Sequence, residues 1–233
     1  MKKLKVMVVF GTRPEAIKMA PLVLELQKHS DCIETITVVT AQHRQMLDQV
    51  LETFRIQPNY DLDIMGKNQS LLDITAKILQ KFNPIVKKEL PDMILVHGDT
   101  TTTFVASLVA FYNQVRIGHV EAGLRTFDKY SPFPEEMNRQ MTDNLADLYF
   151  APTSESKENL LKENHPESAI IITGNTAIDA LKLTVQSDYY HEVLDRLDPL
   201  KKLVLVTMHR RENQGQPMRD VFAALREMVD VHS

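Results

Sequence analysis

Acidic side chains follow two apolar segments in the middle of the chain, at the point where each segment ends. Asp99 comes just after Met93–Val96, and Glu121 comes directly after Val115–Val120. If the two segments are adjacent parallel strands, their carboxyl ends meet at one edge of a sheet, where ligands bind in open α/β folds. The two carboxylates would then lie close together, as general acid–base chemistry requires.

Asp99 has an alternative structural explanation, because aspartate is a preferred N-cap and a helical segment follows it. Glu121 has a weaker one, since a carboxylate beside a buried strand needs a partner or a task. A third acidic candidate, Glu135, opens a helix after the loop Ser131–Pro134. Glu135 has a structural alternative as well, because glutamates in the first turn of a helix complement the helix dipole.

Histidine and arginine residues follow other apolar segments in the same way. His209 comes after Lys202–Met208 and has a side chain suited to acid or base chemistry near neutral pH, although a lone histidine is more often structural. Arg13 follows Gly11 at the start of a helix, where backbone amides favour an anion. Arg139, one turn after Glu135, is a second anion candidate. A solvated loop arginine is the alternative for Arg13.

Several classes of site are disfavoured. The segment after Gly11 lacks the later glycines of a dinucleotide fingerprint and the lysine of a P-loop. His97 and His119 each stand two residues before a carboxylate, but their spacing does not make them converge, so we predict no metal site. A single cysteine excludes an internal disulfide, and the net charge of −4 disfavours nucleic acid as a partner. No apolar run is long enough to span a membrane.

Strand-like and helix-like segments alternate along the chain, which predicts an α/β fold with a doubly wound parallel sheet. We predict a domain over residues 1–185, a linker over 186–200, and over 201–233 the first strand and helix of a second domain. The predicted strands are Lys5–Phe10, Thr35–Thr40, Met93–Val96, Val115–Val120, Leu148–Ala151, Ala169–Ile172 and Lys202–Met208. The predicted helices include Gln45–Phe54, Leu71–Leu90, Thr102–Tyr112, Glu135–Ala146, Ser154–Asn164, Thr176–Thr184 and 218–229.

Taken together, these segments resemble the non-hydrolysing UDP-N-acetylglucosamine 2-epimerase family. The matching motifs run through nearly the whole chain and are GTRPEAIKMAPL, TAQHRQMLD, HGDTTTT, HVEAGLRT, SPFPEEMNR, TGNTAID and TMHRREN. The resemblance implies two Rossmann-like domains, as in the glycosyltransferase-B fold, with the nucleotide between them. It implies reversible conversion of UDP-GlcNAc to UDP-ManNAc by elimination of UDP and re-addition, without a cofactor, which supplies ManNAc for cell-surface polysaccharide or a teichoic-acid linkage.

The resemblance also implies roles for individual residues. Asp99, Glu121 and Glu135 would be acid/base carboxylates, and His209 would contribute from the second domain. Arg13 and Arg139 would face the diphosphate or stabilise the carboxylates. A second, activating UDP-GlcNAc site is implied at Gln42, His43, Gln45 and Gln69, with Arg210 at this site or in substrate binding.

Two other classes stay open at this point. One is a related nucleotide-sugar enzyme, such as the hydrolysing 2-epimerase or a glycosyltransferase of the same architecture, and the other is a non-catalytic nucleotide-sugar binding fragment. The resemblance implies UDP-GlcNAc and UDP as ligands, a homodimer and a cytoplasmic location. Since family members carry a complete second domain, we expect residues 1–233 alone to bind UDP-GlcNAc weakly and not to epimerise it.

Overall fold

The structure is a computed structural model that describes residues 2–41, 44–66, 69–185, 187–198, 200–208 and 215–232. The chain forms two compact units, Met1–Val185 and Gln186–Ser233, and each is described by itself. Within the described residues, no helix is both long and apolar enough to cross a bilayer.

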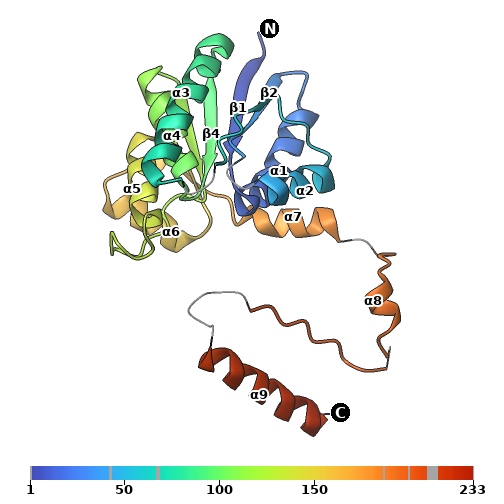
Figure 1. The fold of residues 1–233 in the computed structure, drawn as a ribbon. Coiled ribbons are helices and arrows are strands. Elements are labelled where there is room, and N and C mark those ends of the chain that lie inside the picture. The colour runs from blue at the N-terminus through green and yellow to red at the C-terminus, as the bar shows by residue number, and fades with distance from the viewer. Residues whose placement is uncertain are drawn as a thin grey trace. The chain divides into compact units, whose positions relative to one another are not determined.

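The larger unit is built on a seven-stranded sheet with the strand order β3-β2-β1-β4-β5-β6-β7. Every pairing in it is parallel, so each strand must return through a crossover. The predicted doubly wound α/β fold is confirmed (Figure 1). The strands are β1 Leu4–Phe10, β2 Ile33–Val39, β3 Tyr60–Asp61, β4 Met93–His97, β5 Arg116–Val120, β6 Leu148–Ala151 and β7 Ile170–Ile172.

Helices cover both faces of the sheet. Their bounds are α1 Arg13–Lys28, α2 Arg44–Phe54, α3 Leu71–Glu89, α4 Thr101–Tyr112, α5 Glu135–Leu145, α6 Ser154–Lys162 and α7 Thr176–Thr184, with a short 3₁₀ turn at Glu167–Ala169. In Figure 1, α1 and α2 lie on one side of the strands, and α3 and α4 lie on the other. This arrangement explains why the strands are apolar on both faces rather than alternating.

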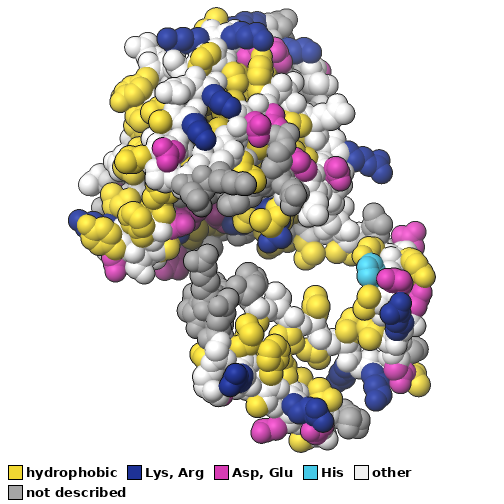
Figure 2. Space-filling view, viewed as in Figure 1, with side chains coloured by type: hydrophobic (Ala, Val, Ile, Leu, Met, Phe, Trp, Pro, Cys, Tyr) yellow, Lys and Arg dark blue, Asp and Glu magenta, His cyan; other side chains and the backbone are white. Residues whose placement is uncertain are grey.

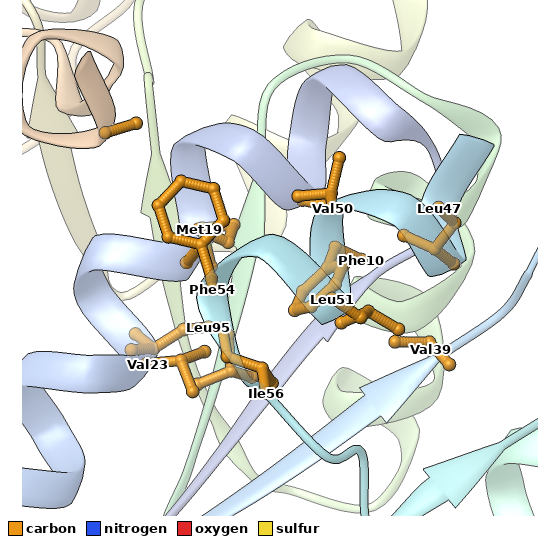
Figure 3. Packing of buried hydrophobic residues seen from close by; sticks show 14 of the residues in the cluster. Phe10, Met19, Val23, Val39, Leu47, Val50, Leu51, Phe54, Ile56 and Leu95 are labelled. Atoms are coloured by element: carbon orange, nitrogen blue, oxygen red, sulfur yellow. The ribbon is translucent and has the colours of Figure 1, made fainter. Parts of the chain in front are cut away.

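The side chains of β1 show how one strand serves two cores. Val6, Val8 and Phe10 pack with residues of α1 and α2, as Figure 3 shows for Phe10 among Met19, Leu47, Leu51 and Phe54. The intervening residues of β1 point the other way and pack against α3 and α4. Because successive strand side chains alternate between faces, a change of register in β1 would disrupt both cores.

The smaller unit differs from its sequence-based prediction. Residues 202–208 form no strand, so the predicted strand Lys202–Met208 is wrong for the described structure. The physical reason is that an apolar segment becomes a strand only when another strand takes up its backbone hydrogen bonds. The unit contains the short helix α8 Glu192–Asp195 and the helix α9 Gln216–His232. Hydrophobic side chains lie on the surface of α9 (Figure 2), and they include Phe222 and Val229.

Candidate functional site

The candidate site lies at the carboxyl edge of the sheet, where β4 and β5 end side by side. His97 at the end of β4 is paired with Val120 at the end of β5. The turns that follow carry Asp99 and Glu121. Gly98 lies between them with a positive φ of 68°, and a Cβ added there would be 3.5 Å from Glu121 Oε2. The chain therefore brings the two predicted carboxylate turns together, and the positive φ at position 98 favours glycine there.

Asp99 is held by α5 rather than used as a helix cap. Arg139 donates to Asp99 Oδ2 from Nε at 3.0 Å and from Nη2 at 2.8 Å. Asn138 donates to the Asp99 carbonyl at 2.9 Å. The N-cap of α4 is Thr100, whose hydroxyl accepts from the Thr103 amide. The alternative explanation of Asp99 as an N-cap is thus wrong, and its carboxylate stays partly exposed at the edge of the sheet.

Arg139 also contacts a second, completely buried carboxylate. Its Nη1 donates to Glu136 Oε2 at 3.0 Å, and the backbone amides of Thr126 and Phe127 donate to the same carboxylate. Burial raises the pKa of Glu136, but hydrogen bonds from Gln140 and these amides outweigh it and hold the pKa below its ordinary value. Arg139 is thus paired with two carboxylates, those of Asp99 and Glu136.

Glu135, the neighbouring residue in the first turn of α5, is half-buried. Its side chain makes no hydrogen bond or ion pair with the residues that the structure describes. It therefore differs from Glu136, which is bound on several sides. Sequence reasoning selected Glu135 and overlooked Glu136, although the three-residue spacing of Glu136 and Arg139 on one helix is the signal for such an ion pair.

Glu121 is held by a lysine that sequence reasoning overlooked. Lys18 Nζ lies 2.5 Å from Glu121 Oε1, and Asn175 Nδ2 donates to the same oxygen at 3.3 Å. Glu121 itself has a positive φ of 66°, a conformation that non-glycine residues rarely adopt and that occurs at functional sites. Lys18 stands in the middle of α1, and only the fold shows that it reaches β5.

His97 lies buried next to Glu121. Its Nε2 is 3.5 Å from Glu121 Oε2, yet neither ring nitrogen has a hydrogen-bond partner in the described part of the chain. Burial, together with the positive charges of Lys18 and His119, lowers the pKa of His97 to about 3. The ring is therefore neutral at physiological pH, and a polar group without a partner faces the carboxylate.

Arg13 is exposed at the first position of α1. The helix N-terminus beside it already holds an internal anion, because Glu15 Oε2 accepts from the amides of Gly11 and Thr12 at 3.0 and 2.6 Å. Glu15 Oε1 accepts from the hydroxyl of Thr100 at 2.7 Å. Glu15 thus joins the loop after β1 to the loop after β4. Sequence reasoning missed this residue, although Thr-x-x-Glu before an apolar run is the signature of a capping box.

Several predicted residues lie outside the described residues. They are Gln42, His43, His209 and Arg210, together with the side chain of Gln45. Gln69 is described, and its amide braces its own loop by donating to the Ile64 carbonyl at 2.8 Å and accepting from the Gly66 amide at 2.7 Å.

Among the described residues, no group of three or more histidine, cysteine, aspartate or glutamate side chains is arranged to hold a metal ion. Both ring nitrogens of His119 are engaged, by Asp143 and by the Gly98 carbonyl. The fold and the site together define a class: a doubly wound α/β protein that places paired carboxylates and cations at the carboxyl edge of its sheet.

Comparisons with known proteins identify the family within that class. The family model described as UDP-N-acetylglucosamine 2-epimerase matches residues 24–232. The UDP-N-acetylglucosamine 2-epimerase of Bacillus subtilis (strain 168) is 61% identical over 229 residues, which covers 98% of this chain and 60% of the relative. The chain belongs to the UDP-N-acetylglucosamine 2-epimerase family.

Solved structures agree with this assignment. A putative UDP-N-acetylglucosamine 2-epimerase from Listeria monocytogenes superposes with a TM-score of 0.91 at 58% identity, covering 99% of this chain and 60% of that one. The UDP-GlcNAc 2-epimerase of Neisseria meningitidis, solved bound to UDP-GlcNAc, gives a TM-score of 0.74 at 57% identity, covering 77% of this chain and 49% of that one. The chain spans about 60% of the length of the curated relatives that it matches.

Proposed function

We propose that this chain contributes the acid–base half of an enzyme that interconverts UDP-GlcNAc and UDP-ManNAc. The observation that carries the proposal is the pair of carboxylates at adjacent turns, each with its own cation, in a chain of this family. Asp99 is paired with Arg139, and Glu121 with Lys18. The Neisseria meningitidis relative was solved bound to UDP-GlcNAc, which supports the same ligand for this chain.

Inversion at C2 by elimination makes definite demands on such a site. A base takes the C2 proton while the C1–O bond breaks, the electron pair forms the C1–C2 double bond, and UDP leaves with the bonding electrons of its oxygen. The resulting 2-acetamidoglucal is attacked again by UDP at C1, and C2 receives a proton on the opposite face. Two carboxylates at one edge supply a base and an acid for these steps, and the residues leave open which one takes the C2 proton.

The remaining predicted residues have roles in this proposal. Glu135, which lacks a protein partner among the described residues, is available as a third acid or base. Arg13 contacts the diphosphate from the start of α1. His209 and Arg210 contribute from a second Rossmann-like domain that residues 201–233 begin, and residues 186–200 link it to the first. Gln42, His43, Gln45 and Gln69 form an activating UDP-GlcNAc site. The enzyme works as a cytoplasmic homodimer.

The experiment uses a fusion of this chain with the part of the Bacillus subtilis relative that the chain does not cover. We expect the fusion to form UDP-ManNAc from UDP-GlcNAc. Asp99→Asn and Glu121→Gln should each lower kcat by about 10²–10⁴-fold, the range for acid–base groups, with unchanged far-UV circular dichroism. Glu158→Gln, at an exposed position on α6, is the matched control.

The products separate the alternatives. Free UDP together with N-acetylmannosamine indicates a hydrolysing enzyme, and binding of UDP-GlcNAc without turnover indicates a binding module. Near-normal turnover in both carboxylate variants would remove Asp99 and Glu121 from the chemistry.

A further inference from the structure

A chain of three buried side chains and one partly exposed carboxylate runs behind the candidate site. His119 Nδ1 lies 2.6 Å from Asp143 Oδ1, and Arg125 Nη2 donates to Asp143 Oδ2 at 2.7 Å. Arg125 also donates to both oxygens of Glu163, from Nε and Nη2 at 2.6 Å each. The side chains of His119, Asp143 and Arg125 are completely buried, while Glu163 reaches the surface. None of these residues was assigned a role above.

The hydrogen bonds at the His119 ring determine its protonation. Its Nε2 lies 2.8 Å from the carbonyl oxygen of Gly98, which accepts only, so Nε2 must carry a proton. Its Nδ1 faces Asp143, which already accepts from Arg125 and from the Gly123 amide at 3.3 Å. A bare Nδ1 would oppose a carboxylate lone pair at this short distance. Both ring nitrogens are therefore donors, and the ring is an imidazolium.

Arg125 and Asp143 compensate each other in the interior, and Glu163, which is partly exposed, also lies 3.6 Å from His165 Nε2. The protonation of His119 therefore follows from the acceptors at its two ring nitrogens. His119 and Arg125 in turn hold the pKa of Asp143 below its ordinary value in spite of burial. Among the other titratable groups that the structure describes, His97 on β4 interacts electrostatically with His119, and Tyr149 is its register partner on β6.

The His119 ring is connected to the candidate site through the backbone carbonyl of Gly98. The Gly98 carbonyl that it binds belongs to the turn that carries Asp99 and lies against Glu121. The same turn is held by the bond from Asn138 to the Asp99 carbonyl and by the bond from the Gly98 amide to the Val120 carbonyl. We propose that His119 is a positioning residue, whose ring, held by Asp143, fixes the Gly98–Asp99 turn in its reactive geometry. The kinetic part of this proposal rests on the proposed function.

The first test needs no activity. Nitrogen-15 spectra of the histidine side chains in residues 1–233, recorded at neutral pH, should show a proton on both ring nitrogens of His119, because both face acceptors. An unprotonated ring nitrogen at His119 in these spectra would overturn the proposal.

Two substitutions separate positioning from mere support of the fold. In His119→Gln the amide nitrogen takes the place of Nε2 and keeps the donor to the Gly98 carbonyl. In His119→Asn the amide nitrogen takes the place of Nδ1, so the donor to Asp143 remains and the bond to Gly98 is lost. In the active fusion, we expect His119→Asn to lower kcat of the folded enzyme by about 10²-fold, as misplaced catalytic groups do, with KM little changed. His119→Gln should lose clearly less, and His29→Asn nothing.

The outcomes distinguish this proposal from the proposed function. If the unaltered fusion makes no UDP-ManNAc, the proposed function fails, and the amide shifts of Gly98 and Asp99 in residues 1–233 decide on positioning: Asn at 119 should move them and Gln should not. The positioning role of His119 would be refuted if His119→Asn had the same kcat as the parent fusion, or if both variants moved the amide shifts of Gly98 and Asp99 equally. If the variants do not fold, the protonation state measured in the unaltered chain decides.

Discussion

Glu15 joins two loops of the candidate site from a completely enclosed position, and its removal should cost more than the loss of one surface contact. Its carboxylate accepts from the buried amide of Gly11, from the part-buried amide of Thr12 and from the hydroxyls of Thr100 and Thr103. In Glu15→Ala both amides lose their partner, although water can reach the Thr12 amide in part. At about 1–3 kcal/mol for an unsatisfied buried group, we expect the free energy of unfolding to fall by at least about 1–3 kcal/mol.

Glu15→Gln should be far milder, because glutamine can offer each partner what it needs. Its carbonyl oxygen accepts from the amides of Gly11 and Thr12, and its NH₂ group faces the two threonine hydroxyls, which can rotate to accept. We expect a loss within about 1 kcal/mol, the net contribution of an ordinary hydrogen bond. The difference in the free energy of unfolding between Glu15→Gln and Glu15→Ala therefore reports the contribution of the hydrogen bonds from the two backbone amides.

The penalty of Glu15→Gln should also depend on pH in a definite direction. Burial raises the pKa of Glu15 above its ordinary value of 4.5, against hydrogen bonds that favour the charged form. Between pH 4.5 and the raised pKa, the folded chain keeps a proton that the unfolded chain releases, so wild-type stability falls as pH rises through this window. Glutamine has no such proton. The penalty should thus be largest at low pH and shrink as pH rises.

Urea denaturation followed by far-UV circular dichroism is the suitable assay, because the chain has no tryptophan for fluorescence. Glu25→Gln is the matched control, since Glu25 is exposed on the same helix. If Gln and Ala destabilise the chain equally, or if the Gln penalty grows with pH, the reasoning from the hydrogen bonds of Glu15 is refuted.

Three further predictions concern binding, protonation and local stability. Arg13→Ala should weaken UDP binding by removing a charge-assisted contact of roughly 1.5–3 kcal/mol; calorimetry showing unchanged affinity and a lowered Tm would make Arg13 structural. Because the pKa of His97 is lowered to about 3 from the ordinary 6.5, the unfolded chain binds a proton below pH 6.5 that the folded chain does not. The free energy of unfolding should therefore decrease as the pH is lowered below 6.5. A His97→Gln variant whose free energy of unfolding shows the same pH dependence would contradict this. Amides of residues 202–208, which form no strand, should exchange rapidly while those of β1 and β4 are protected; slow exchange in 202–208 would reveal a pairing.

The main strands were predictable because each is a short, nearly continuous apolar run that ends at a turn residue. β4 and β5 differ from their predicted bounds by a single residue at one end. Lys202–Met208 has the same composition, yet it forms no strand. Composition reports that a segment can be buried, whereas a strand also needs a partner, which no local pattern contains. β3, with two residues, was too short to be visible as a periodic segment.

The carboxylates of the site were predictable from their place after strands, but their partners were not. Lys18 looks like a solvated residue of an amphipathic helix until the fold brings it to Glu121. Arg139 had two predicted tasks, and the decision between them depends on Asp99, which lies forty positions away. His119 looked like a neighbour of Glu121 in sequence, whereas the structure turns its ring toward Asp143. Long-range pairing is thus the part that sequence patterns do not contain.

These pairings have a consequence for the anionic ligand that we propose. Lys18 and Arg139 are each bound to carboxylates, so their charges are already compensated before a substrate arrives. A diphosphate brings further negative charge to the same edge and needs cations that are not engaged in this way. Arg13 makes no ion pair with any residue that the structure describes. For the function that we propose, we therefore expect a division among the cations of this edge, in which Lys18 and Arg139 hold carboxylates and Arg13 meets the leaving group.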